Sequence, residues 1–220
     1  MMNLKFLVFL GSVRDSTPPN PARLGLRVAR ACLSQITSRS IAATLIDPLH
    51  FNLGGVFKPH FSFPTGSSPA SIEELAASIE AADGYVMVSP EYNHTMSPAL
   101  VHLLNHFGSS LFSYKPSAIV TYSAGQWGGA RAAVGMRTFL SELGCLPVSA
   151  MIHIPAAQEV FDENGHYLGA VDAPAWTNYT GRAFDQLMWW ATAAKNHRSA
   201  AGSGLMPPAF KKDPSQRNAP

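Results

Sequence analysis

The chain has 220 residues, of which 46% are hydrophobic and 14% are charged, and its formal net charge is +2. This composition is typical of a globular chain with one sizeable core and excludes a disordered protein. The few lysines and arginines are scattered, which argues against a nucleic-acid-binding protein, and no apolar run is long enough to span a bilayer.

The amino-terminal part predicts a strand, a helix and a second strand. Residues 4–10 form a short apolar run without a cleavage site, which favours a first strand over a leader sequence. A loop at residues 11–23 follows. Apolar residues then recur at helical spacing from Leu24 to Ile36, and residues 41–46 predict the second strand.

The next part contains a long stretch, a helix and a third strand. Residues 50–69 are rich in glycine, proline and phenylalanine and are longer than an ordinary connection, so we expect a functional or mobile segment. Ser71 and Glu74 have the spacing of a capping box and predict the start of the second helix. The apolar run 85–88 predicts a strand buried on both faces, and residues 89–96 predict a loop.

The central part repeats this strand–loop–helix pattern. Ser97 is expected as N-cap of the third helix, with Pro98 at its first position. Residues 117–122 predict the fourth strand, residues 123–129 a glycine-rich loop before a helix, and residues 146–154 the fifth strand.

The carboxyl-terminal part predicts a hairpin and a last helix. Residues 160–168 read as a hairpin turned by Asn164-Gly165, and a helix is expected from about Thr180. The alternation of strands and helices predicts an α/β fold with a doubly wound, five-stranded parallel sheet in the flavodoxin-like order 2-1-3-4-5. We expect one domain at residues 1–200 and a flexible tail at 201–220.

Three loops should meet at one edge of this sheet, because the carboxyl ends of parallel strands lie together. The first loop offers the Ser12 hydroxyl, the Arg14 and Arg23 guanidinium groups and the free amides of a helix start, which suit a phosphate. It carries neither a Rossmann nor a Walker fingerprint, so a loop with solvated arginines stays open as an alternative.

The other two loops suit a planar ring approached by backbone atoms. Residues 89–96 offer an aromatic ring, a carboxylate and an amide side chain, and Gly125, Gly128 and Gly129 permit close approach. The order of the elements and four motifs together resemble the NADPH-dependent FMN reductase family over roughly residues 4–195. The four motifs are Gly11-Ser-x-Arg14, Arg23-Leu-Gly25, Pro90-Glu-Tyr-Asn93 and Ser123-Ala-Gly-x-x-Gly-Gly129.

That family is flavodoxin-like and includes flavin, quinone, azo-dye and chromate reductases. The resemblance implies bound FMN, NADPH or NADH as the electron donor, a small-molecule acceptor, and hydride transfer through flavin N5 without a catalytic acid or base. The stretch 15–22 is longer than the family's compact loop. The cofactor-binding residues that the resemblance implies are Ser12, Arg14, Arg23, Leu24, Pro90, Glu91, Tyr92, Asn93, Ser123, Gly125, Gln126, Gly128 and Gly129.

The resemblance also implies an oxidoreductase that forms a homodimer or homotetramer, and we expect a cytoplasmic location with no nucleic-acid or membrane partner. The main alternative is a non-enzymatic flavodoxin-type electron carrier or a flavin-binding redox sensor.

Two further interpretations of the sequence have weaker support. Ser123 stands in an imperfect hydrolase elbow, and His102 and His106 lie one helical turn apart without a metal-protease motif, so no metal site is expected. Three of the four tryptophans, Trp127, Trp189 and Trp190, are expected in the core or at a subunit interface.

Overall fold

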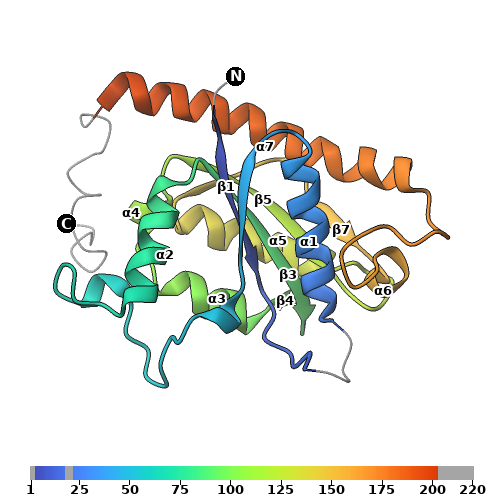
Figure 1. Ribbon diagram of the computed structural model, residues 1–220, viewed down its shortest axis with the longest axis horizontal. Coiled ribbons are helices and arrows are strands. Elements are labelled where there is room, and N and C mark those ends of the chain that lie inside the picture. Colours follow the sequence, from blue (N-terminus) through green and yellow to red (C-terminus); the bar gives the residue numbers. More distant parts are fainter. Residues whose placement is uncertain (1–2, 18–21, 203–220) are drawn as a thin grey trace.

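A twisted, mainly parallel sheet runs through the middle of the molecule with helices on both faces, as the computed structural model in Figure 1 shows. The structure describes residues 3–17 and 22–202. The strands are β1 (Lys5–Leu10), β2 (Ala42–Ile46), β3 (Gly84–Tyr92), β4 (Thr95–Met96), β5 (Lys115–Tyr122), β6 (Cys145–Pro147) and β7 (Ile152–Ile154). The α-helices are α1 (Leu24–Thr37), α2 (Ala70–Ala81), α3 (Pro98–Asn105), α4 (Ser109–Phe112), α5 (Ala130–Glu142), α6 (Ala157–Val160) and α7 (Ala173–Ala201).

The strand order is β2-β1-β3-β5-β6, which confirms the predicted doubly wound arrangement. The sheet has seven strands rather than five, for two reasons. Short β4 pairs antiparallel with β3, and the predicted fifth strand is divided into β6 and β7, both parallel to β5. At the division the Gln186 side chain on α7 accepts hydrogen bonds from Ser149 Oγ (2.9 Å) and Ala150 N (3.0 Å), so these groups are satisfied outside the ladder.

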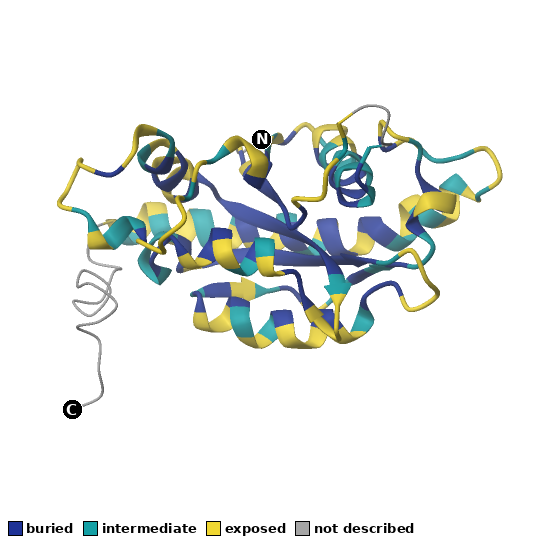
Figure 2. Cartoon of the chain, turned by 90° about the horizontal axis from the view of Figure 1, so that it is seen from below, coloured by how far each residue is buried: buried dark blue, intermediate teal, exposed yellow. Residues whose placement is uncertain are grey.

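Two apolar cores lie on the two faces of the sheet. One packs α1, α6 and α7 against the sheet, and the other packs α2, α3, α4 and α5. Figure 2 shows the central strands buried between helices whose outer sides are exposed. Because β1, β3 and β5 contribute side chains to both cores, their sequences are continuous apolar runs rather than alternating ones.

Helix starts differ from the prediction where the capping group was misjudged. The third helix is as predicted, with Ser97 accepting from Leu100 N and Pro98 in the first turn. The capping box at Ser71 is wrong, because α2 begins at Ala70 without a side-chain cap. The last helix begins seven residues before Thr180, since the Asp172 carboxylate accepts from Ala175 N (2.9 Å) and caps it there.

The remaining connections follow local turn chemistry. The predicted hairpin at residues 160–168 is present as an antiparallel bridge between Phe161 and Tyr167, with Gly165 at a φ of 84°. The predicted tail begins inside α7, and residues 203–220 lie outside the described residues. Within the described residues, no helix combines the length and the apolar content that crossing a bilayer requires.

Candidate functional site

Tyr122, the last residue of β5, lies where the three predicted loops meet. Its side chain is buried and lies beside the Ser12 side chain of the first loop. Burial raises the pKa of Tyr122 and the nearby Tyr92 phenol raises it further, while the Ser12 side chain and the charges of Arg23 and Arg14 oppose them. A Cβ added at Gly25 would collide with the Tyr122 hydroxyl, so the first turn of α1 also packs on this ring. The predicted convergence of the loops is therefore seen in the structure.

The first loop is tied to the sheet by its first residue. Gly11 donates its N–H to Val88 O (2.7 Å), and its carbonyl accepts from Ser97 Oγ (2.6 Å). Ser97 is also the N-cap of α3, so one hydroxyl joins β1 to the start of a helix. Arg14 follows as an exposed cation, while Ser12 is buried.

Arg23 occupies a different position from the one expected of a phosphate ligand. Its guanidinium is buried, forms an ion pair with Asp47 at the end of β2, and donates to the Ser12 carbonyl. Nε has no hydrogen-bond partner among the described residues. Arg23 therefore connects the first loop to the end of β2. Of the two arginines predicted to bind the phosphate, Arg14 is the exposed one. Leu24 is the first residue of α1, and the helix has no side-chain cap.

The predicted loop at residues 89–96 is mostly strand. β3 continues to Tyr92, and a two-residue turn then leads into β4. Asn93 and His94 form this turn with φ values of 50° and 64°, which is the left-handed pattern of a type I′ hairpin. Pro90 is buried, whereas 40% of the Tyr92 side-chain surface is exposed at this edge. Asparagine tolerates this conformation well, and that was the signal for the turn.

Glu91 is turned toward α5. Its side chain is only 7% exposed and pairs with Arg131. Its Oε2 also accepts backbone hydrogen bonds from Arg131 (3.2 Å) and Ala132 (3.4 Å) in the first turn of α5. Burial alone would raise the pKa of Glu91, but the ion pair and the two N–H groups hold it below its ordinary value. The carboxylate therefore caps the first turn of α5.

The glycine loop, residues 123–129, is shaped by Ser123. This hydroxyl donates to Gly125 O (2.7 Å) and accepts from Gly128 N (2.9 Å). Gly128 and Gly129 have φ values of 58° and 79°, and a Cβ at either position would press on β7 or β5. Packing and backbone conformation therefore require glycine at positions 128 and 129, whereas a Cβ at Gly125 would meet open space. Gln126 is exposed, and Trp127 has an exposed fraction of 61%, which excludes the core but not the subunit interface among its two predicted places.

The structure does not assemble the weaker alternatives. A serine hydrolase would need an acid and a histidine beside Ser123, but the Ser123 hydroxyl is hydrogen-bonded within its own loop. Asp172 and His197, which follow it in the chain, lie near opposite ends of α7. His102 and His106 have ring centroids 4.7 Å apart, but in the described parts of the chain no three His, Cys, Asp or Glu side chains could hold a metal.

The site as a whole fits an anionic group attached to a flat ring. Arg14 and the uncapped start of α1 offer positive charge and free amides at one end of the edge. Tyr92 and the open backbone at Gly125 offer surfaces for a ring at the other. Tyr122 was not predicted as part of the site. The sequence signal for it was an aromatic residue at the end of a buried strand, together with the glycine at position 25 that leaves room for its ring.

Comparisons with known proteins agree with this reading. The family model described as NADPH-dependent FMN reductase matches residues 4–159. An NAD(P)H-dependent FMN reductase of Pseudomonas aeruginosa is 35% identical over 46% of this chain and 56% of its own length. A quinone reductase of Escherichia coli is 39% identical over 33% of this chain and 40% of its own length. The chain thus spans about half the length of these curated relatives.

A solved structure supports the fold. The flavoenzyme NAD(P)H:(acceptor) oxidoreductase FerB of Paracoccus denitrificans superposes with a TM-score of 0.63 at 17% identity, over 84% of this chain and 98% of FerB. At that identity the likeness establishes the flavodoxin-like fold alone.

Proposed function

The chain belongs to the NADPH-dependent FMN reductase family, and from this premise we propose that it binds FMN at the carboxyl edge of its sheet and is an NAD(P)H-dependent oxidoreductase. The electron acceptor is a small molecule: a flavin, a quinone, an azo compound or a metal oxyanion. The observation that carries the proposal is the meeting of three loops around Tyr122. Open α/β sheets bind their ligands at this edge.

The phosphate of FMN would be held by the first loop. Ser12 and Arg14 lie there, and Leu24 begins the uncapped α1. An exposed guanidinium and free amides at a helix start both favour an anion. Arg23 contributes indirectly, because its bond to the Ser12 carbonyl fixes the backbone of this loop.

The ring would lie between the hairpin and the glycine loop. Pro90, Tyr92 and Asn93 bound one side, and Gly125 with Gln126 bounds the other. When bound, FMN would supply the hydride chemistry, so the chain needs to orient the ring and exclude water rather than provide an acid or base. Glu91 fixes the position of the hairpin relative to the glycine loop, because it binds the start of the helix that follows this loop, α5.

Negative charge on the reduced ring would be stabilised by loop amides and not by the start of α5. The first-turn amides of Arg131 and Ala132 already donate to Glu91. The amides of Gln126 and Trp127 have no hydrogen-bond partner in the described chain and are available for an acceptor atom.

An anaerobic titration tests the proposal directly. Purified protein loaded with FMN should show the visible spectrum of a bound flavin, and that absorbance should bleach on addition of NADPH or NADH. It should recover and turn over when a quinone or free flavin is added. If neither nicotinamide cofactor bleaches the flavin while a partner reductase does, the protein is an electron carrier instead.

We also propose a homodimer or homotetramer in the cytoplasm. Trp189 and Trp190 on α7 are 64% and 42% exposed, which suits a surface covered by a second subunit. Cys32 and Cys145 are free and buried, which suits a reducing compartment. Light scattering on the purified protein tests the assembly, and a monomer at micromolar concentration would contradict it.

A further inference from the structure

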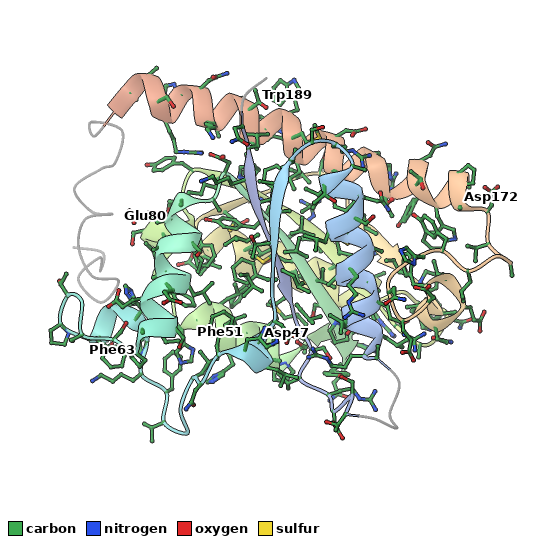
Figure 3. All side chains as sticks on the ribbon, viewed as in Figure 1. Asp47, Phe51, Phe63, Glu80, Asp172 and Trp189 are labelled. Atoms are coloured by element: carbon green, nitrogen blue, oxygen red, sulfur yellow. The ribbon has the colours of Figure 1, made fainter. Side chains whose placement is uncertain are left out.

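A separate cavity of about 380 Å³ lies between the carboxyl end of β7 and the first turns of α7. Its volume is in the range of about 300–1,000 Å³ that is usual for ligand pockets. The start of α7, where Figure 3 labels Asp172, forms one side of it. Its lining residues are His153, Pro155, Asp172, Ala175, Trp176 and Tyr179.

Two aromatic rings stand at right angles in its wall. The ring centroids of Trp176 and Tyr179 are 5.7 Å apart, and their planes make an angle of 85°. The Arg182 guanidinium lies 4.7 Å from the centroid of the Tyr179 ring and helps to fix it. A flat molecule placed in this corner can stack on one ring while its edge meets the other.

His153 supplies a hydrogen-bonding atom to the same corner. Its Nδ1 is 2.8 Å from Thr121 Oγ1, whereas the other acceptor for that hydroxyl, Ile152 O, is 3.4 Å away. In the tautomer in which Thr121 donates this short bond to Nδ1, the neutral imidazole carries its proton on Nε2. Burial, and then the nearby Arg182 charge, lower the pKa of His153 and favour this neutral form.

The Nε2 atom is free for a ligand. It has no hydrogen-bond partner in the part of the chain that the structure describes, and its residue lines the cavity. The main chain of His153 is held by a hydrogen bond from its N–H to the Tyr179 hydroxyl (2.9 Å), so the ring is fixed from two sides. Asp172 is the one charged residue that lines the cavity, and the Arg182 guanidinium lies nearby over the Tyr179 ring.

We propose that His153 adopts this tautomer and that the cavity binds an uncharged planar aromatic molecule whose carbonyl or ring nitrogen accepts a hydrogen bond from Nε2. The rings of Trp176 and Tyr179 provide stacking, and the opposite charges of Asp172 and the nearby Arg182 give no preference for an ion. This inference does not depend on the proposed reductase activity.

Calorimetric titration with coumarin, a flat and redox-inert carbonyl compound, tests the site. The full chain is titrated both without FMN and with saturating FMN, and naphthalene is the comparison ligand without an acceptor. We expect saturable coumarin binding that is at least tenfold tighter than naphthalene binding. Trp176→Ala should weaken coumarin at least tenfold, Trp176→Phe should retain most of it, and His153→Phe should abolish the preference over naphthalene.

The matched control is Trp189→Ala, which removes an exposed tryptophan of the same helix far from Asp172 (Figure 3). It should leave coumarin binding unchanged. The proposal fails if coumarin does not bind up to its solubility limit, if FMN displaces it, or if His153→Phe binds coumarin like the parent protein. Thermal melting of each variant identifies any that is unfolded, and if Trp176→Ala is unfolded, His153→Phe decides.

Discussion

The Glu91 carboxylate, at the end of β3, forms an ion pair with Arg131 in the first turn of α5. The same carboxylate accepts two backbone N–H groups of that turn. It therefore joins the hairpin to the helix that follows the glycine loop. One side chain therefore holds two walls of the candidate flavin site at a fixed separation.

Glu91→Gln should reduce the free energy of unfolding by about 1–3 kcal/mol at pH 7, because charge-assisted hydrogen bonds of a buried carboxylate are lost. The pKa of Glu91 is lowered in the folded protein, so its stabilisation is present above its ordinary value of 4.5 and is lost as the pH falls through the lowered value. Urea unfolding at pH 7 and pH 3 measures both. A variant that is equally destabilised at both pH values would mean that the charge contributes nothing.

Arg14→Ala should weaken FMN binding by about 1.5–3 kcal/mol, roughly 10- to 150-fold, if this exposed guanidinium contacts the phosphate. Thermal stability should not change. Riboflavin, which lacks the phosphate, should bind parent and variant equally, and Lys58→Ala serves as a control at another exposed cation. Flavin fluorescence quenching measures these affinities, and an FMN affinity equal to that of the parent would remove Arg14 from the site.

Arg23→Ala should act on folding before it acts on the flavin. Removing one partner of a buried ion pair leaves the Asp47 carboxylate unpaired and costs about 3–5 kcal/mol. Asp47→Asn alone should also destabilise, and the double variant should be less unstable than the sum of the two single changes. Denaturant unfolding gives all three values. A stable Arg23→Ala variant with weakened FMN binding would restore Arg23 as a phosphate ligand.

Gly129→Ala and Gly125→Ala should differ in kind. At Gly129 the φ of 79° is strained for alanine, and its Cβ would lie 2.7 Å from Thr121 Cβ, so we expect lost stability of about 1–3 kcal/mol. At Gly125 a Cβ meets no atom within 4 Å, so the fold should be unchanged and only a ligand would be obstructed. Melting temperature and FMN affinity separate these outcomes. Equal stability of the two variants would show that packing does not explain the choice of glycine at 129.

Local signals in the sequence were enough to predict the fold class and the sheet edge that carries the candidate site. Apolar runs such as residues 85–88 mark strands buried on both faces, and Ser97-Pro98 starts a helix through contacts within one turn. These signals are local, because periodicity and capping depend on neighbours along the chain. The order of strands and helices then predicts which loops share the carboxyl edge.

The contacts of the charged side chains in the candidate site depend on long-range packing and could not be predicted from the sequence. Arg23 pairs with Asp47, and Glu91 pairs with the start of α5, although both belong to motifs that indicate a ligand. The same holds for Gly129, whose missing side chain makes room for Thr121. A partner that is distant in the chain is chosen by packing and by the cost of burying a charge alone, and neither is visible in the residues next to it.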